Sequence, residues 1–230
     1  MMVIENHKGV NVVRDDLLTG GTKSVLMPSI IGSDSEYVYA SPVYGGFQIA
    51  LSAYCQSVGK KATIFCAKRN VKHANTRTCE RYGAKVVEVP CGYLAVVEKH
   101  AKDYCARTGA KKLVFGAKSI ENKTIIANRV REAIEQVGAE PYEIWCAIGS
   151  GTLVESILMA TKTARVYGVQ VGAEYTGKHP RLTVLKYPRP FEYESKFVAG
   201  FQSMANYDRK AFELCVKNKM SRNAMFWNVL

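Results

Sequence analysis

The side chain best suited to covalent chemistry is the amine of Lys23, in the segment Gly20-Gly21-Thr22-Lys23-Ser24. Glycines reach backbone conformations closed to other residues and let the chain approach a ligand closely. Thr22 or Ser24 is a typical first residue of a helix, and an apolar run starts at Val25. Because a helix N-terminus disfavours an ammonium ion, a desolvated Lys23 would become a nucleophile toward an aldehyde or carbonyl. The alternative is an ordinary solvated lysine.

Two further loops combine glycines with the start of a helix. Gly149-Ser150-Gly151-Thr152 follows an apolar strand at 142–146 and precedes a helix at 153–160. Amide groups in such a loop can point at one anion, and the helix dipole adds to the attraction. Tyr44-Gly45-Gly46-Phe47-Gln48 opens a helix that continues to about residue 57, and its amides could bind a carboxylate. Taken alone, either loop can also be a simple tight turn.

The elements that position these loops alternate between short apolar strands and amphipathic helices, which predicts an α/β fold with parallel sheets and flanking helices. Function in such folds lies at the carboxyl ends of the strands. We expect strands at 37–40, 62–66, 85–89, 112–115, 142–146, 165–168 and 182–187, with helices at about 72–82, 93–107, 123–137 and 153–160. The residues after 207 predict a helix and an apolar terminus packed on the core.

Arg14-Asp15-Asp16-Leu17, a short gap and the Lys23 segment resemble the cofactor-lysine segment of the fold type II pyridoxal phosphate (PLP) enzymes, the tryptophan synthase β-like superfamily. The resemblance is strongest to the aminocyclopropane-carboxylate deaminase and D-cysteine desulfhydrase branch. It implies PLP fold type II in a shortened form. Residues 1–40 and 121–230 would form the larger, PLP-holding domain, and residues 41–120 a smaller inserted domain.

The same resemblance implies roles for individual residues. Lys23 would form the internal aldimine with PLP and serve as acid or base at the substrate's α-carbon. Glu174 or Tyr175, after the strand at 165–168, would face the cofactor ring, and Tyr207 would lie near it. Phosphate binding would fall to Gly149, Ser150, Gly151 and Thr152, and substrate binding to Tyr44, Gly45, Gly46, Phe47 and Gln48.

The loop after residue 41 departs from the family, because the usual Ser-Gly-Asn or Ser-Asn-His signature is absent. That departure leaves the substrate and the standard deaminase chemistry open. Deamination, β-elimination and decarboxylation share the same equipment, since the protein selects the bond that breaks by its orientation to the PLP ring. The expectation is therefore a lyase-type enzyme acting at the α-carbon of an amino acid.

The net charge of +12, with a pI near 9.4, calls for a separate explanation. A basic protein gains encounter rate and affinity for polyanions, and Arg77 and Arg81 would lie on one face of a regular helix. The resemblance extends to short PLP enzymes of bacteriophages that hypermodify thymine, which would make an amino-acid-modified DNA base the substrate. The alternatives are a free amino acid substrate with a merely solvated basic surface, and a DNA-binding relative without catalysis.

A competing resemblance concerns the acid pair Asp15-Asp16. The segment Asp15 to Thr22 is similar to the ribose-phosphate loop of phosphoribosyltransferases, in which paired acids contact the ribose hydroxyls. That loop normally follows an apolar strand and several earlier elements, whereas only fourteen residues precede Asp15. The reading stays open as an alternative function.

Composition and cysteine content indicate which broad class of protein the chain belongs to. Apolar content of 47% and charged content of 23% are ordinary for a globular protein. Seven cysteines without a CxxC pair argue against a disulfide framework and a metal site, so we expect buried reduced thiols. Without a membrane-spanning run or a signal peptide, the expectation is a cytoplasmic protein, or one in the host cytoplasm if phage-encoded. Fold type II enzymes are commonly dimers, which implies a homodimer.

Overall fold

The computed structural model describes residues 2–90 and 92–230, and the chain divides into two compact units. Unit 1 comprises residues 1–17 and 116–230, and unit 2 comprises residues 18–115. The domain boundaries expected after residues 40 and 120 therefore differ from the observed divisions. Residues 18–40, which include Lys23, belong to unit 2, because Gly20 packs directly on a helix of that unit.

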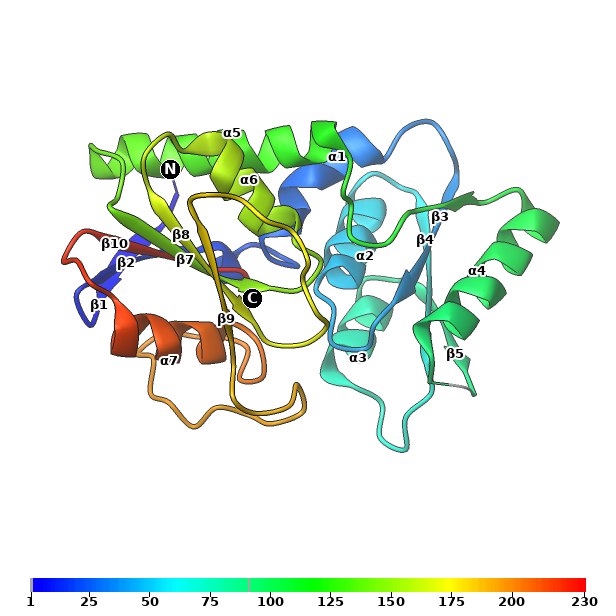
Figure 1. Cartoon of the computed structure of the whole chain (residues 1–230). Coiled ribbons are helices and arrows are strands. Elements are labelled where there is room, and N and C mark those ends of the chain that lie inside the picture. Colours follow the sequence, from blue (N-terminus) through cyan, green and yellow to red (C-terminus); the bar gives the residue numbers. More distant parts are fainter. Residues whose placement is uncertain (1, 91) are drawn as a thin grey trace. The chain divides into compact units, whose positions relative to one another are not determined.

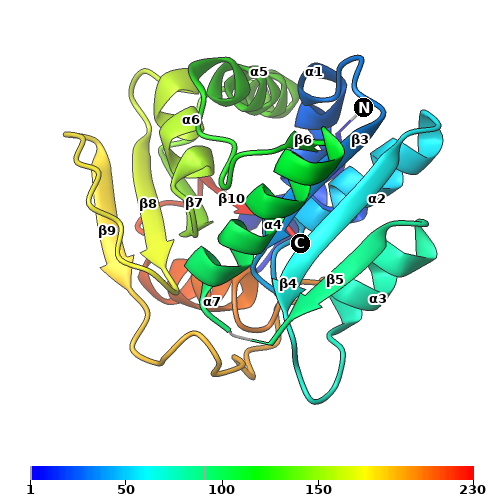
Figure 2. The ribbon, with the colours of Figure 1, turned by 90° about the vertical axis from the view of Figure 1, so that its right-hand side faces the viewer.

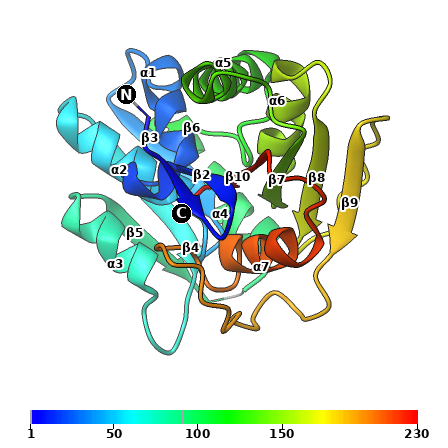
Figure 3. The same ribbon diagram turned by 90° about the vertical axis from the view of Figure 1, so that its left-hand side faces the viewer.

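Unit 1 is built on a six-stranded sheet in the order β1-β2-β10-β7-β8-β9. Only β1 and β2 are antiparallel, and the other neighbours are parallel. Figure 3 shows the β1–β2 hairpin in dark blue beside β10 in red. The strands are β1 (Ile4–His7), β2 (Val10–Arg14), β7 (Glu143–Ile148), β8 (Arg165–Gln170), β9 (Leu182–Lys186) and β10 (Ala224–Asn228).

Helices cover both faces of the unit 1 sheet. Helices α5 (Ile120–Val137) and α6 (Thr152–Ala160) lie on one face and α7 (Asp208–Asn218) on the other (Figure 1). The pattern follows from helical periodicity, because the buried residues of each helix recur every three or four positions. On α5 these are Ile126, Ala127, Val130 and Ala133, and on α7 they include Ala211, Phe212 and Cys215.

Unit 2 contains a four-stranded parallel sheet in the order β5-β4-β3-β6. Helix α4 packs on one face, and α2 and α3 lie on the other (Figure 2). The strands are β3 (Glu36–Ser41), β4 (Lys61–Ala67), β5 (Lys85–Val89) and β6 (Lys111–Lys112). The helices are α2 (Phe47–Ser57), α3 (Ala74–Arg81) and α4 (Leu94–Thr108), preceded by the short 3-10 helix η2 (Thr22–Leu26) and α1 (Met27–Ile30). Another short 3-10 helix, η1 (Asp15–Leu17), belongs to unit 1.

The expected α/β architecture with parallel sheets and flanking helices is confirmed. The strand expected at 112–115 is shorter than predicted, because only Lys111 and Lys112 pair with β3, and Val114 is 77% exposed. The apolar C-terminal residues do more than pack on the core. They form β10, which pairs in parallel with both β2 and β7 and is fully buried.

The six described cysteines are free thiols, and five of them are buried. In the described residues, no helix is long and apolar enough to cross a membrane. The same residues contain no group of three or more His, Cys, Asp or Glu side chains that could hold a metal ion.

Candidate functional site

The loop between β7 and α6 contains the residues expected from the sequence to bind a phosphate. Strand β7 is buried along its whole length and ends at Ile148, and α6 begins at Thr152 after the N-cap residue Gly151. The first amide groups of a helix have no carbonyl partner within the helix, and the dipole favours a negative charge there. The hydroxyl of Thr152 donates to the Gly116 carbonyl at 2.7 Å, which fixes the start of the helix.

Glycine is required in this loop because side chains from elsewhere in unit 1 close on the backbone. Gly151 has φ 89°, a conformation that disfavours other residues, and a Cβ there would lie 2.4 Å from Cε2 of Tyr175. A Cβ on Gly149 would lie 2.7 Å from the Tyr207 hydroxyl. The structure therefore brings Tyr207 and Tyr175 to the phosphate loop, as two aromatic walls around a backbone without side chains.

Tyr175 connects the loop to an ion pair between Glu155 of α6 and Lys123 of α5. Its hydroxyl donates to Glu155 Oε1 at 3.2 Å, and Glu155 Oε2 pairs with Lys123 Nζ at 2.5 Å. Burial, with the nearby Glu155, raises the pKa of Tyr175 to about 12. Glu174, the other residue expected to face the cofactor ring, is exposed to solvent. Of the two sequence-based candidates, Tyr175 is the one that reaches the loop.

Asp208 is a buried acid that the sequence reasoning missed. It follows Tyr207 directly, is fully buried, and accepts a hydrogen bond from the Leu230 amide on Oδ2 at 3.0 Å. Among the described residues its Oδ1 has no hydrogen-bond partner. Burial raises the pKa of Asp208 from 3.8 to about 8. A buried, half-satisfied carboxyl next to a loop-contacting tyrosine is a typical sign of a functional site.

In unit 2, Lys23 lies in η2, one residue after its start. Gly20 and Gly21 have φ 87° and 76°, and a Cβ on Gly20 would lie 2.3 Å from the Ala50 amide nitrogen of α2. The glycine pair therefore lets this segment lie directly on the helix backbone, whereas the sequence predicted a close approach to a ligand. The Lys23 side chain is partly buried. The helix begins at Thr22, but its N-cap is Gly21 and no side chain caps it.

The loop between β3 and α2 is organised by Gln48, which changes the expected role of that residue. Its amide Nε2 donates to the carbonyls of Val43 and Gly45, each at 2.9 Å, and of Pro42 at 3.3 Å. Gln48 is fully buried, so its side chain holds the loop rather than a substrate. Phe47 is also buried, with its ring 4.6 Å from that of Tyr39.

As a correction to the expected substrate set, the side chains of Phe47 and Gln48 are therefore structural. Gly46 is the N-cap of α2, and the first amides of that helix remain as possible donors to a carboxylate. Tyr44 and Gly45 are partly buried at the same loop.

His73 is a second residue that the sequence reasoning missed, and it lies against the substrate-loop candidate Tyr44. The two rings meet edge to face, with centroids 4.7 Å apart. Nδ1 of His73 accepts a hydrogen bond from the Asn75 amide at 3.2 Å and caps α3. Burial and the charges of Arg77 and Arg69 lower the pKa of His73. A histidine just before a helix, in the loop that follows β4, was the available signal.

The phosphoribosyltransferase reading is wrong, because both carboxylates on which it depends hold unit 1 together. Asp15 is fully buried and accepts bonds from Arg129 Nε at 3.1 Å and from Trp227 Nε1 at 3.0 Å. Asp16 accepts two bonds from the Arg14 guanidinium, at 2.9 and 2.8 Å. Neither acid is available to a ribose.

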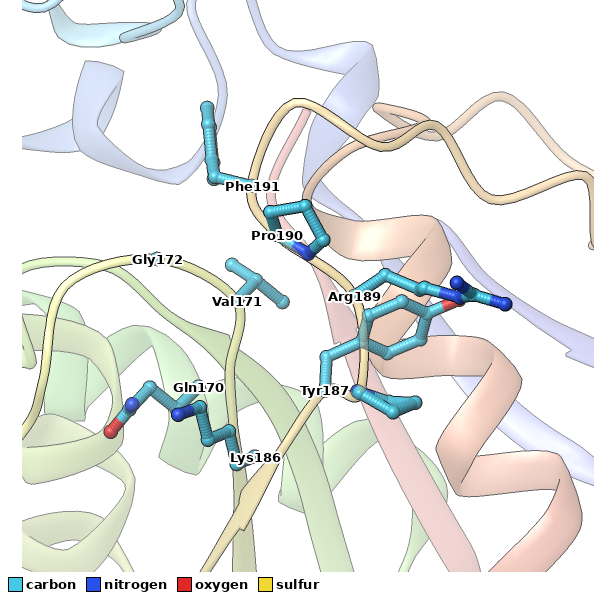
Figure 4. Close-up of a pocket in the computed structure, with 9 residues that line it drawn as sticks. Gln170, Val171, Gly172, Lys186, Tyr187, Arg189, Pro190 and Phe191 are labelled. Carbon is cyan, nitrogen blue, oxygen red and sulfur yellow. The ribbon is translucent and has the colours of Figure 1, made fainter.

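A pocket of about 370 Å³ lies beside the ends of β8 and β9, and it contains none of the predicted site residues. Its wall is held by Lys210, a fully buried lysine whose ammonium donates to the carbonyls of Pro190 at 2.7 Å and Phe191 at 3.0 Å. Figure 4 shows the side chains of Gln170 and Lys186 on one side of the pocket and Arg189 on the other. Since the cationic groups diverge, the pocket gathers no common anion site.

Comparisons with known proteins agree with this geometry. The chain belongs to the family of pyridoxal-phosphate dependent enzymes, whose profile matches residues 29–218. No curated protein matches the chain. In fold the chain is similar to an ACC deaminase homologue, with 17% identity, coverage of 99% of this chain and 88% of that chain, and a TM-score of 0.83.

Two further solved structures share the fold. One is a hydrogen sulfide-producing enzyme from Fusobacterium nucleatum, with 13% identity, coverage of 100% and 94%, and a TM-score of 0.74. The other is O-acetyl serine sulfhydrylase isoform 3 from Entamoeba histolytica, with 11% identity, coverage of 100% and 84%, and a TM-score of 0.74. The fold is therefore that of the fold type II PLP enzymes, and the family identifies PLP as the cofactor.

The residues of unit 1 fit this cofactor. The first amides of α6 have no carbonyl partner within the helix and could donate to a phosphate, and Gly149 and Gly151 add no side chain of their own to the loop. The orphaned Oδ1 of Asp208 is an acceptor that lacks a protein donor. A phosphate and a protonated ring nitrogen are the two groups of PLP that need such partners.

Proposed function

We propose that the protein is a PLP-dependent enzyme that breaks a bond at the α-carbon of an amino acid, by deamination, β-elimination or decarboxylation. The observation that carries the proposal is the glycine loop of residues 149–152, in a chain that belongs to the PLP enzyme family. When bound, PLP supplies an electron sink for the bond that breaks at the α-carbon. The reaction class is lyase-type.

In this proposal each loop has one task. The amides at the start of α6 bind the cofactor phosphate, and those at the start of α2 bind the substrate carboxylate. Lys23 bonds the cofactor through its amine and moves a proton at the α-carbon. Lys23 precedes the matched range 29–218, so its assignment rests on the resemblance of the Gly-Gly-Thr-Lys-Ser segment and on the glycine-supported η2.

The experiment that tests the proposal is the absorption spectrum of the purified protein with PLP, before and after borohydride reduction. We expect a band that borohydride removes, and a reduced cofactor on the peptide that contains Lys23. Lys23→Ala should lack the trapped adduct, whereas Lys162→Ala, which removes an exposed lysine, should retain it. Trapping on another lysine would reassign the catalytic amine, and the absence of any band would reject the enzyme.

Asp208 is our candidate for the partner of the cofactor's ring nitrogen. Because burial raises the pKa of Asp208 to about 8, the folded protein without cofactor keeps a proton that the unfolded chain loses near the usual pKa of 3.8. The free energy of unfolding should therefore fall as pH rises from about 4 to about 8, and this fall should be absent from Asp208→Asn. A cationic ring nitrogen of bound PLP would favour the charged carboxylate of Asp208. PLP should therefore reduce the fall in the free energy of unfolding between these pH values.

Urea unfolding at pH 5.5 and pH 8, with and without PLP, measures this dependence. The wild type without PLP should lose stability relative to Asp208→Asn between the two pH values. An equal pH dependence in wild type and variant would show that Asp208 ionises normally. If PLP flattened the dependence equally in both proteins, Asp208 would not be the ring partner.

An amino acid attached to a DNA base is the second candidate substrate, and the distribution of charge favours it. Unit 2 contains fourteen Lys and Arg against six Asp and Glu, so it carries eight of the twelve net positive charges. None of the similar solved structures described above is named as an enzyme that acts on nucleic acid. The comparisons therefore do not support a modified DNA base as substrate, and they do not support thymine hypermodification. Tight, salt-dependent DNA binding would support it, and such binding without a PLP band would indicate the DNA-binding relative without catalysis.

The assembly and location also remain proposals. We propose a homodimer in the cytoplasm, as is common for fold type II enzymes. Sedimentation equilibrium with and without PLP tests the dimer, and a single species of one chain mass of 25.5 kDa would reject it.

A further inference from the structure

The segment that follows β4 carries positive charges that the structure leaves uncompensated. Lys72 is neutralised by Glu80 at 2.6 Å, with Glu88 at 3.9 Å. Those two acids are thereby occupied. Within residues 2–90 and 92–230, no carboxylate forms an ion pair with four exposed cations of this segment: Lys68, Arg69, Arg77 and Arg81.

Arg77 is held so that its guanidinium lies at the beginning of α3. Its backbone amide donates to the His73 carbonyl at 3.1 Å, and its Nη1 donates to the Lys72 carbonyl. The side chain, although exposed, therefore folds back toward residues 72 and 73. A guanidinium has five donors, so several remain for another acceptor.

His73 presents a hydrogen-bond donor beside this guanidinium. Because Nδ1 accepts from the Asn75 amide, the neutral ring carries its proton on Nε2. Burial, Arg77 and Arg69 all lower the pKa of His73, which keeps the ring in this neutral form at pH 7. Arg77 is placed beside this ring by its bonds to the carbonyls of Lys72 and His73, and Arg69 lies four residues before His73 in the same segment.

The aromatic contact connects the three groups to the substrate loop. The ring of Tyr44, in the loop that precedes α2, lies edge to face on His73 with 4.7 Å between centroids. A substrate whose α-carboxylate binds at the start of α2 would therefore have His73 and Arg77 beyond one aromatic ring, with Arg69 four residues before His73 in the same segment. Groups with donors and positive charge at that position suit an anionic side chain.

We propose that Arg69, His73 and Arg77 form a recognition site for a second anionic group, so that the preferred amino acids carry a negatively charged side chain. The inference rests on the proposed function for the identity of the substrate, but the anion site itself does not need the cofactor. It assigns a specificity role to three residues of the segment after β4, and none of the three takes part in the bond-breaking step.

The first test compares aspartate with asparagine, as both enantiomers, in the PLP-loaded protein. The two amino acids have nearly the same shape and differ by one charge. Binding is followed by the change in the cofactor spectrum. We expect about tenfold tighter binding of aspartate, reduced severalfold in Arg69→Gln, whose side chain makes no hydrogen bond or ion pair among the described residues that folding would miss.

Arg81→Gln is the matched control, because it removes an exposed arginine of the same helix one turn beyond Arg77. It should keep the preference for aspartate. Equal binding of aspartate and asparagine by the wild type would overturn the inference while leaving the PLP enzyme intact. An equal loss in Arg69→Gln and Arg81→Gln would also overturn it, since general surface charge would then explain the preference.

A second test remains valid if the protein does not bind PLP. Inorganic phosphate is titrated into the full chain while the ring resonances of its four histidines are followed by NMR, with His73 assigned through His73→Gln. Phosphate should shift the His73 resonance in wild type and in Arg81→Gln, and much less in Arg69→Gln. An unmoved His73 resonance at phosphate concentrations that shift other signals would reject the anion site.

Discussion

Two loops of this protein have the same position in their units and nearly the same glycine content, yet they are built in opposite ways. One follows β7 and precedes α6, and the other follows β3 and precedes α2. In the first, Tyr207 and Tyr175 take up the space beside Gly149 and Gly151 and leave no room for a Cβ. In the second, the interior is filled by the amide of Gln48.

The difference shows that a glycine pair before a helix has two physical meanings. Where aromatic side chains close on the backbone, only glycine leaves room for them, and the loop amides can then be directed at an anion. Where a buried side chain satisfies the loop carbonyls, the loop becomes a rigid support, and only the helix amides beyond it are left for a ligand. Substitutions in the two loops should therefore fail in different ways.

The largest expected effect is that of Gly151→Ala on cofactor affinity. The new Cβ would meet the Tyr175 ring at 2.4 Å, and the backbone has φ 89°, so the loop must move. We expect about a hundredfold weaker PLP binding, equivalent to about 2.7 kcal/mol, as the amides lose their common direction. A titration of PLP followed by absorbance measures the dissociation constant.

Gly138→Ala separates backbone strain from loop closure. Gly138 ends α5 with φ 88° and ψ −13°, almost identical to the φ 89° and ψ −13° of Gly151, but nothing lies within 4 Å of its added Cβ. Both variants should lose about 1 kcal/mol of stability from the left-handed conformation. Only Gly151→Ala should lose PLP. Equal PLP affinity in the two variants would contradict the steric account of the loop.

The second loop should respond through stability instead. Gln48→Leu removes the amide donor that the carbonyls of Pro42, Val43 and Gly45 share. The leucine that replaces it is apolar and of similar size. Leaving buried carbonyls without a partner should cost about 2 to 3 kcal/mol in the free energy of unfolding, measured by urea denaturation. PLP affinity should change little, because the cofactor phosphate is assigned to the other loop.

Gln56→Leu supplies the comparison, since Gln56 is an exposed glutamine on the same helix and should change stability by less than about 0.5 kcal/mol. A similar stability loss in both variants would indicate a helix effect. A loss of PLP binding in Gln48→Leu as large as that in Gly151→Ala would remove the contrast between the loops.

Local sequence predicted the parts of this molecule that depend on short-range pattern. The alternation of strands and helices, the α/β class and the glycine-containing turns before Thr152 and Lys23 all follow from residue type and spacing. The central place of β10 did not, because its pairing joins residues about two hundred positions apart, such as Val12 and Phe226. The hairpin of β1 and β2 was also not predicted, although its partners, such as Ile4 and Val13, are close in sequence.

The same limit applies to the candidate site. Gln48 looks from sequence like a polar residue of a binding loop, and only its burial and its three carbonyl partners show a structural role. Asp208 and His73 are unremarkable in sequence, since their character comes from burial and from neighbours brought by other elements. Asp15 and Asp16 looked from sequence like a ribose-binding acid pair, and only the folded structure shows that arginine and tryptophan donors occupy both carboxylates.

The smallest effect we predict concerns the acid beside the open loop. Glu155 lies in the first turn of α6, where its charge would oppose a bound phosphate unless Lys123 compensates it at 2.5 Å. Lys123→Ala should weaken PLP binding roughly fivefold, a modest change because both side chains are partly exposed. Lys162→Ala, which removes a cation beyond the far end of α6, should leave affinity nearly unchanged.

The double variant Lys123→Ala with Glu155→Gln decides whether charge is the cause. If the role of Lys123 is to neutralise Glu155, removing the negative charge as well should restore PLP affinity to near the wild-type value. The effect of Lys123→Ala should also shrink at high salt, because partly exposed charges are screened. A double variant as weak as the single one would mean that Lys123 contacts the cofactor or shapes α5, and the loop would then depend on a cation as well as on its glycine amides.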